Sequence, residues 1–278
     1  MDYVSNLVDK ANEFIEKNDG NVVEKKVIEW LSILMILSAF IVAAGLLILK
    51  YRVKYGRYCS ESALGEYSLD SRIGWIIQES PSLIIAALAY FRMPGTNWNV
   101  YNFFAVSMFV LHYFQRTVIY SYLIKSGKTL PIHCMLAGVV FTSWNGYIQG
   151  HYHALYSDFD ESFTSKLAYY IGAAIFFVGF FINIDSDARL RSLRKDSNDH
   201  SYKIPRGGIF EYVSGANFFG EILEWFGYAI FCRTLPAFAF SLFTVANTMP
   251  RALDHHNWYL KKFEDYPKDR KAVFPFLL

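Results

Sequence analysis

Seven apolar segments of about membrane-spanning length follow one another along this 278-residue chain. A bilayer core is crossed by roughly 20 residues of α-helix, and each segment has about that length. Polar residues interrupt the second, fourth and sixth segments. We therefore expect an all-α integral membrane protein with seven transmembrane helices. The segments cover residues 27–49, 75–93, 100–123, 130–152, 166–184, 214–234 and 235–253.

The composition agrees with a membrane setting. Hydrophobic residues make up 53% of the chain and charged residues only 19%, whereas charged residues make up about a quarter of an ordinary soluble domain. Cys59, Cys134 and Cys232 lack metal-ligand spacing and cannot all pair within the chain, so no disulfide scaffold is expected. The first apolar segment is too long and too far from the N-terminus for a signal peptide, and we expect a retained anchor.

The placement of lysine and arginine predicts an orientation. Of 27 such residues, 19 lie in the first, third and fifth loops and the C-terminal tail, and seven lie in the N-terminal segment and the even loops. Because basic loops stay on the cytosolic side, the N-terminus is predicted outside and the C-terminus in the cytosol. No linker or internal repeat divides the chain. We expect an extracytosolic segment at 1–26 and a single membrane domain at 27–278.

Polar side chains enter the apolar helix predicted within the stretch from Ser201 to Ala229. Asn217, Glu221 and Glu224 follow at spacings of four and three and therefore share one helical face. Charged groups within a bilayer are costly and usually functional. This helix is expected to face a polar feature of the protein.

Two other apolar segments carry ionisable groups. Glu79 precedes Pro81, whose ring frees a carbonyl one turn back and loosens the helix. Glu79 is either a snorkelling or paired glutamate near the interface, or a buried carboxyl that stays protonated and donates a hydrogen bond. Arg116 lies mid-helix, four residues after His112 and three after Tyr113, and needs an anionic partner. A structural pair with a membrane carboxylate and a ligand-binding role are both open, and they are compatible.

Two further groups of polar residues are ambiguous. Those of the fourth segment are interpreted as interhelical hydrogen-bonding groups, with a metal-binding HxH pair as the weaker alternative; they are Asn145, Gln149, His151 and His153. Asn183 and Asp187 share a face that continues to Arg191 and Arg194. Carboxylates beside arginines suit a ribose hydroxyl beside phosphates, although a basic cytosolic loop explains the arginines equally well.

Several common signatures are missing. The chain has no G-x-G-x-x-G after a strand and no G-x-x-x-x-G-K-[ST], so neither a Rossmann nor a P-loop phosphate site is indicated. One HH pair among seven histidines is poor support for a diiron oxygenase. A nucleotide would have to bind through arginine, aspartate and asparagine side chains inside the helical bundle.

Several motifs, in the same order, resemble the steroid 5-alpha-reductase family, the NADPH-dependent 3-oxo-5-alpha-steroid 4-dehydrogenases. The resemblance covers residues 74–278 and implies seven helices that enclose a buried NADPH and substrate cavity open to lipid. The implied reaction reduces the double bond of a 3-oxo-Δ4-steroid by hydride transfer to carbon 5 and protonation at carbon 4. The motifs are IIQESPS, LHYFQR, NIDSDARLRSLRK, YKIPRGGIFEYVSGANFFGEILEWFGYA and YLKKFEDYPKDRKAVFPFLL.

The resemblance also implies roles for individual residues. Glu79 and Tyr113 match the catalytic pair that holds the 3-oxo oxygen, and Gln78 and Arg116 are implied as further substrate-binding residues. Glu224 matches no ligand position and is expected to partner a buried basic group. The implied cofactor contacts are Arg116, Asn183, Asp187, Arg194, Ser201, Tyr202, Asn217, Glu221, Arg251, His255 and Tyr259.

Some positions depart from the animal steroid enzymes and leave the natural substrate open; these are Lys125, Lys128, Asp185, Lys203 and Asp254. A reductase of an enoyl thioester or a polyprenol is the nearest alternative, and a non-catalytic transporter or lipid-binding protein is the alternative of another class. The expected partners are an apolar steroid or related enone lipid and the bilayer, without nucleic acid or metal. We expect a multi-pass monomer, in the endoplasmic reticulum of a eukaryote or the inner membrane of a bacterium.

Overall fold

The computed structural model describes residues 20–50, 67–91, 99–124, 129–194 and 201–278, and regular structure in these ranges is almost entirely helical. The all-α prediction is therefore confirmed. Two-residue strands, β1 (Ser68–Leu69) and β2 (Leu130–Pro131), pair antiparallel. The long helices are α2 (Gly20–Leu47), α3 (Ser71–Phe91), α4 (Val100–Phe114), α6 (Ile132–His151), α7 (Phe163–Ser192), α8 (Ala216–Cys232) and α9 (Leu235–Lys262).

Short helical pieces extend or connect these helices. The π-helical turns η3 (Gln115–Tyr120) and η4 (Tyr152–Tyr156) continue α4 and α6, and the short helix α5 (Ser121–Leu123) follows η3. A 3-10 turn, η5 (Gly208–Glu211), precedes α8. Single π-helical turns inside α-helices are rare and often lie at functional sites, and η3 contains Arg116.

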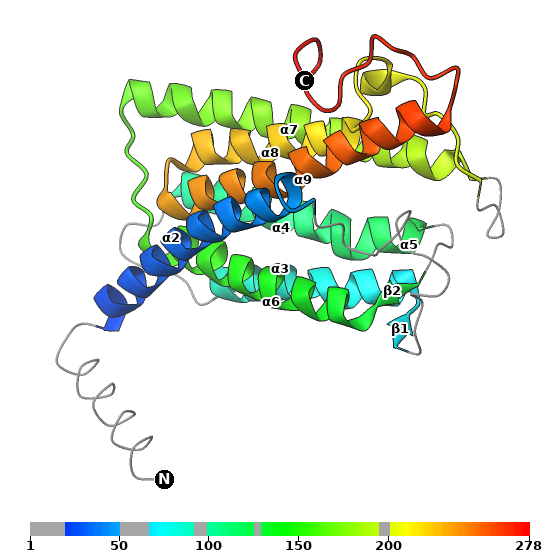
Figure 1. Cartoon of the computed structure of the whole chain (residues 1–278). Coiled ribbons are helices and arrows are strands. Elements are labelled where there is room, and N and C mark those ends of the chain that lie inside the picture. The colour runs from blue at the N-terminus through cyan, green and yellow to red at the C-terminus, as the bar shows by residue number, and fades with distance from the viewer. Residues whose placement is uncertain (1–19, 51–66, 92–98, 125–128, 195–200) are drawn as a thin grey trace.

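The helices run back and forth and pack side by side as one bundle (Figure 1). Each predicted apolar segment coincides with a described helix, although α7 and α9 continue eight or nine residues beyond their predicted ends. Within the described ranges, three helices are long and apolar enough to cross a membrane: Asn21–Leu47, Ser71–Phe91 and Phe163–Ser192. The structure thus supports a helical membrane protein, and the crossing of all seven segments remains a prediction.

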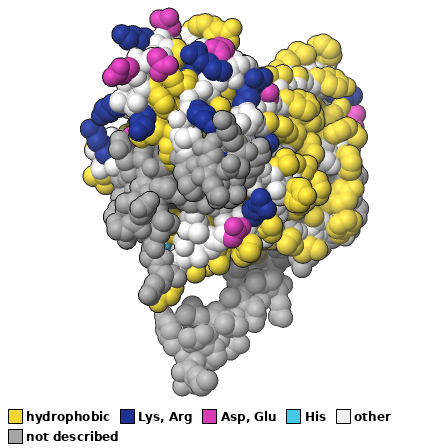
Figure 2. All heavy atoms as spheres, turned by 90° about the vertical axis from the view of Figure 1, so that its right-hand side faces the viewer, with side chains coloured by type: hydrophobic (Ala, Val, Ile, Leu, Met, Phe, Trp, Pro, Cys, Tyr) yellow, Lys and Arg dark blue, Asp and Glu magenta, His cyan; other side chains and the backbone are white. Residues whose placement is uncertain are grey.

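The outer surface of the bundle exposes large apolar side chains. Trp30, Phe181 and Val140 are exposed to 70%, 63% and 68%. Figure 2 shows such side chains gathered along one side of the molecule, with lysine, arginine, aspartate and glutamate side chains concentrated mainly away from them. Exposed apolar patches of this extent mark a surface covered by other molecules, and a lipid bilayer is the covering that suits helices of this length.

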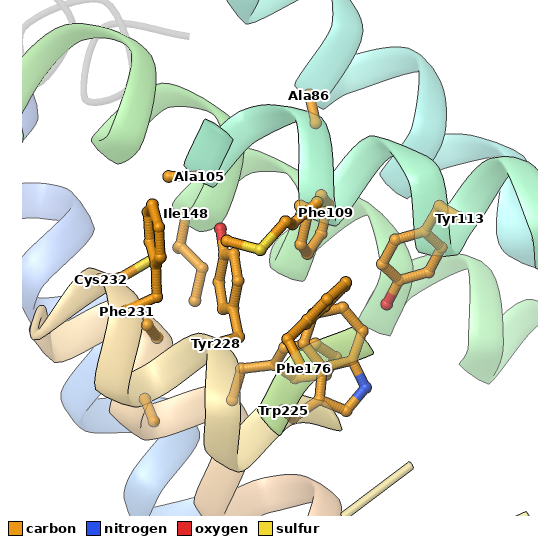
Figure 3. Close-up of a cluster of buried hydrophobic side chains, with 14 of the residues drawn as sticks. Ala86, Ala105, Phe109, Tyr113, Ile148, Phe176, Trp225, Tyr228, Phe231 and Cys232 are labelled. Atoms are coloured by element: carbon orange, nitrogen blue, oxygen red, sulfur yellow. The ribbon is translucent and has the colours of Figure 1, made fainter. Parts of the chain in front are cut away.

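The interior of the bundle is largely aromatic. Phe109 and Tyr113 of α4 meet Phe176 of α7 and Trp225 and Tyr228 of α8, all of them buried (Figure 3). The Trp225 ring centroid lies 5.8 Å from that of Phe109 and 5.5 Å from that of Tyr228. Tilted and edge-to-face contacts of this kind add to the free energy of burial. The polar site described below borders this cluster.

Glycines bring the backbones of α7 and α8 into direct contact. A Cβ at Gly179 would lie 2.2 Å from the Glu224 nitrogen, and one at Gly227 would lie 2.3 Å from the Phe176 nitrogen. Gly172 and Gly220 have equally close backbone neighbours on the facing helix. Small residues at helix interfaces permit such approach in membrane proteins. The polar ends of α7 and α8 are thereby held together.

The C-terminal segment 263–278 packs on the loop that precedes α8. Val213 and Lys271 form a parallel bridge, with the Ser214 nitrogen donating to the Lys271 carbonyl over 2.9 Å. The Gly207 N–H donates to the Glu211 carboxylate, and this bond holds the pKa of that carboxyl below its usual range. Buried Arg270 donates to the Pro205 carbonyl at 3.0 Å and to Glu211 at 3.4 Å.

Replacing Arg270 with leucine is expected to loosen this segment without disrupting the helical bundle. Hydrogen bonds to charged groups each contribute about 1.5–3 kcal/mol, and the leucine removes two of them. Thermal unfolding in detergent should begin at a lower temperature, and limited proteolysis should release residues 263–278 sooner. Lys268→Leu, at an exposed position nearby, is the control. Equal proteolysis of the two variants would contradict the role given to Arg270.

Candidate active site

Pro81 lies inside α3 and does not break it. Proline lacks the N–H that would bond to the Ile77 carbonyl, and the Ser80 hydroxyl donates to that carbonyl instead over 3.2 Å. The freed backbone group that the sequence predicts is therefore satisfied within the same turn. The helix stays continuous past Glu79.

Reciprocal hydrogen bonds fasten α3 to α6 at the level of Glu79. Thr142 Oγ1 donates to the Gln78 carbonyl at 2.6 Å, and Ser82 Oγ donates to the Thr142 carbonyl at 2.7 Å. A Cβ at Gly146 would lie 2.7 Å from the Ser82 Cα, so the two helices touch here. The backbone that carries Glu79 is thus fixed on two sides.

The Glu79 carboxyl accepts a hydrogen bond from its neighbour. Gln78 Nε2 donates to Glu79 Oε1 over 3.0 Å, and both side chains are half-buried. Since only one oxygen is engaged by this bond, the other remains available for a substrate group. The structure thus places the implied substrate-binding residue Gln78 directly against the implied catalytic residue Glu79.

The Tyr113 hydroxyl lies in the interior and is polarised by an amide. Tyr113 is 3% exposed, and Asn145 Nδ2 donates to its hydroxyl oxygen over 3.0 Å. Glu79 is close enough to interact electrostatically with this hydroxyl. A hydroxyl that accepts a hydrogen bond becomes a better donor through its own hydrogen. The Tyr113 hydroxyl is therefore a polarised potential donor with the Glu79 carboxyl near it.

Asn145 is a site residue that the sequence interpretation did not assign. Its predicted role as an interhelical hydrogen-bonding group is confirmed, because it joins α6 to α4. Gln149 Nε2 donates to Asn145 Oδ1 at 3.3 Å and to the Pro236 carbonyl at 2.8 Å. The spacing of four between Asn145 and Gln149 is visible in the sequence, but nothing there shows that Tyr113 is the partner.

Arg116 has the anionic partner that its mid-helix position requires. Its Nη1 donates to Asp187 Oδ2 of α7 over 2.8 Å, so the predicted structural pairing is confirmed. The guanidinium also lies 4.9 Å from the Trp75 ring centroid and 4.2 Å from that of Tyr120. Cation–π contact and the ion pair together hold a buried charge beside the implied catalytic pair. A ligand role for Arg116 remains a proposal.

Glu224 contacts a histidine, as expected for a partner of a buried basic group. His112 Nδ1 lies 2.8 Å from Glu224 Oε1. Glu221, one turn earlier on α8, interacts electrostatically with Arg116 and His112. His112 thus belongs to the site, although the sequence interpretation noted only its spacing from Arg116. Its position immediately before Tyr113 is the signal that could have identified it.

The other implied cofactor residues lie at the same end of the bundle. Asn183 Nδ2 of α7 donates to the Asn217 carbonyl of α8 at 3.0 Å. Ring contacts join Tyr202 to Trp258, His255 to Phe218 and Tyr259 to Tyr266. Arg194 and Ser201 flank residues 195–200, which lie outside the described part, and Arg251 lies on α9 two turns before Tyr259. Hydrogen bonds thus join Arg116 to Asp187 and Asn183 to Asn217, and the remaining residues lie near them at the same end of the bundle.

The polar groups at this end suit a dinucleotide. Arg191 Nη1 is buried and has no hydrogen-bond partner among the described residues. Arg191 also lies near the Asp187 carboxylate, so cationic and acceptor groups stand side by side. Phosphates need such cations and ribose hydroxyls need such acceptors. In the described part of the chain, no group of three or more His, Cys, Asp or Glu could hold a metal ion.

Comparisons with known proteins give consistent matches. The family model described as 3-oxo-5-alpha-steroid 4-dehydrogenase matches residues 128–278. The chain is 41% identical over 227 residues to 3-oxo-5-alpha-steroid 4-dehydrogenase 1 of Bos taurus, covering 81% of this chain and 87% of the relative. It is 41% identical over 243 residues to 3-oxo-5-alpha-steroid 4-dehydrogenase 2 of Homo sapiens, covering 86% and 94%.

Proposed function

The chain belongs to the 3-oxo-5-alpha-steroid 4-dehydrogenase family, and from that premise we propose that it reduces the Δ4 double bond of a 3-oxosteroid with NADPH. The observation that carries the proposal is the pairing of Glu79 with Gln78 and of Tyr113 with Asn145. Glu79 and Tyr113, the two proposed donors to the substrate, lie near the carboxylates of Asp187 and Glu221 and the guanidinium of Arg116. Such a site can bind an enone oxygen on one side and a nucleotide on the other.

Glu79 and Tyr113 would stabilise the charge that develops on the 3-oxo oxygen. As the double bond is reduced at carbon 5, negative charge accumulates on this oxygen as an enolate. A protonated Glu79 and the Tyr113 hydroxyl can both donate to it, and Asn145 keeps the hydroxyl oriented and polarised. Donors of this kind are worth roughly 2.7–4 kcal/mol each in the transition state. An ionised Glu79 would repel the enolate instead.

NADPH, when bound, supplies the hydride. Asp187 and Glu221 can accept hydrogen bonds from ribose hydroxyls, and Arg116 and Arg191 provide buried positive charge for phosphates. The implied contacts from the other segments would complete the binding surface; these are Asn183, Arg194, Ser201, Tyr202, Asn217, Arg251, His255 and Tyr259.

The proposed arrangement in the membrane has seven spans, an extracytosolic N-terminus and a cytosolic C-terminus. The alternating course of the helices supports it, because the ends of α5, α7 and α9, which precede the third loop, the fifth loop and the tail, lie at one end of the bundle (Figure 1). The implied cofactor residues lie at that end too. NADPH from the cytosol could reach the site there, and an apolar substrate could arrive from the lipid.

The proposal is tested by incubating the purified protein with NADPH and progesterone or testosterone. We expect loss of absorbance at 340 nm together with a 5-alpha-reduced 3-oxosteroid identified by mass spectrometry. No loss of absorbance and no saturated product would reject the steroid assignment. Consumption of NADPH with only an enoyl thioester or a polyprenol would establish the alternative reductase.

Replacing Glu221 with alanine is expected to weaken NADPH binding about tenfold or more, because a hydrogen bond to a charged group contributes about 1.5–3 kcal/mol. Titration of the cofactor by fluorescence measures this directly. Glu161→Ala, which removes an exposed carboxylate beyond the other end of α7, is the control. Unchanged affinity in Glu221→Ala would leave Glu221 with a structural role only.

A further inference from the structure

His112 and Glu224 form a buried pair that the proposed reaction does not use. His112 comes from α4 and Glu224 from α8, and their atoms Nδ1 and Oε1 lie 2.8 Å apart. The residues are 4% and 0% exposed. The second carboxyl oxygen, Glu224 Oε2, is buried and has no hydrogen-bond partner among the described residues. The orientation of this carboxyl is therefore fixed by its hydrogen bond to His112 of α4.

The pair lies between the two halves of the candidate site. Tyr113 follows His112 on α4 and belongs to the half that would bind the enone oxygen. Glu221 lies one turn before Glu224 on α8 and belongs to the half that would bind the nucleotide. Electrostatic interaction links His112 with Glu79, Arg116, Asp187 and Glu221, which lie in both halves.

The bond ties α4 to α8 at one position along their length. The two helices run in opposite directions (Figure 1), so Glu221 lies toward Arg116 when Glu224 meets His112. A slip of α8 by one turn, about 5.4 Å, would move Glu221 away from Arg116. The aromatic contacts of Trp225 with Phe109 and Tyr113 are tilted and are less directional than a hydrogen bond. The hydrogen bond between His112 and Glu224 would be broken by such a slip.

We propose that the His112–Glu224 hydrogen bond is a positioning device for the reaction, which aligns the helix bearing Tyr113 with the helix bearing Glu221. It thereby sets the distance between the bound enone and the nucleotide. This inference rests on the proposed function. Misplacement of reacting groups by about 1 Å can reduce a rate about 100-fold, whereas the affinity for each ligand depends on contacts within its own half.

Three variants test the proposal. Glu224→Gln keeps an oxygen that can accept from His112 and gains an N–H that can donate to it, so its kcat should stay within about threefold of the wild type. Glu224→Leu removes the acceptor and should reduce kcat about 30- to 100-fold. The double variant His112→Phe/Glu224→Leu replaces a buried polar pair with apolar groups, which proteins often tolerate in their folding. It should keep a melting temperature near the wild-type value and still show the loss of kcat.

Ligand binding and isotope effects separate positioning from general damage. In the double variant, the dissociation constants for NADP⁺ and for steroid should change less than about threefold, and the deuterium isotope effect with labelled NADPH should rise as hydride transfer becomes limiting. Glu24→Leu is a control from another His–Glu pair of the bundle, because Glu24 lies 2.9 Å from His151 Nδ1 and also accepts from the Tyr147 and Tyr156 hydroxyls. It should leave kcat unchanged in the folded protein.

Two results would overturn the inference. A double variant with wild-type kcat would show that the pair only balances charge. A Glu224→Gln variant as slow as Glu224→Leu would show that ionisation, and not the hydrogen bond, is required. Both results can be interpreted only if the wild-type protein reduces steroid. A wild type without activity would reject the proposed function, and the role of the His112–Glu224 pair would then be tested by the binding and melting measurements.

Discussion

Replacing Glu79 with leucine is expected to reduce kcat for steroid reduction about 100- to 1000-fold, the usual effect of removing one donor to an oxyanion. The leucine cannot donate a hydrogen bond to the 3-oxo oxygen. Glu79→Gln keeps an N–H donor at nearly the same place and should retain more turnover than the leucine variant. Initial rates at saturating NADPH measure the difference, and cofactor affinity should change little in either variant.

Tyr113→Phe supplies a second test of the same donor pair. The phenyl ring keeps the packing against Phe109 and Trp225, so the fold should survive while the hydroxyl is lost. Since the two donors would act on one oxygen, the losses in the double variant should not add. If Glu79→Leu turned over steroid as fast as the wild type, Glu79 would have no part in the reaction.

Replacing Gly179 with valine is expected to separate α7 from α8 and to prevent stable folding. The Cβ would lie 2.2 Å from the Glu224 nitrogen and 2.6 Å from the Gly220 carbonyl oxygen. These are backbone atoms of a packed helix, so they cannot move as a flexible side chain does. Overpacking in ordinary cores costs about 1–3 kcal/mol, and a backbone clash should exceed that. Thermal unfolding and size-exclusion chromatography in detergent measure the effect.

Gly45→Ala is the matched control for this prediction. Gly45 also lies in a long apolar helix, but a Cβ there has no atom within 4 Å. Alanine favours a helix over glycine by about 1 kcal/mol, so this variant should be as stable as the wild type or slightly more stable. A Gly179→Val protein with the same melting temperature as Gly45→Ala would show that α7 and α8 are not in backbone contact.

The helices could be predicted because each leaves a local trace in the sequence. An apolar run must be long enough for the bilayer, and so the predicted segments coincide with α2 to α9. Their ends were less well predicted at α7 and α9, which continue beyond the apolar runs into polar residues such as Asp187 and His255. Beyond the lipid, helix propensity and packing decide where a helix ends, and hydropathy does not report them.

Pairing between residues far apart in the chain could be predicted only in part. The need of Arg116 for an anion and of Glu224 for a basic partner follows from the cost of burying a charge alone. The identities of the partners, Asp187 and His112, do not follow, since several carboxylates and histidines were available. Asn145 was interpreted as an interhelical hydrogen-bonding group, and its contact with Tyr113 was invisible for the same reason.

By itself, the sequence determined that this protein is helical, apolar on its outside and supplied with ionisable groups inside, because length, hydropathy and spacing are properties of one segment at a time. Its motifs also indicated the family. Only the tertiary structure decided which groups meet: Glu79 with Gln78, Tyr113 with Asn145, and His112 with Glu224. The last of these contacts depends on how α7 and α8 approach through their glycines and how α4 lies along α8. That packing is a property of the whole bundle.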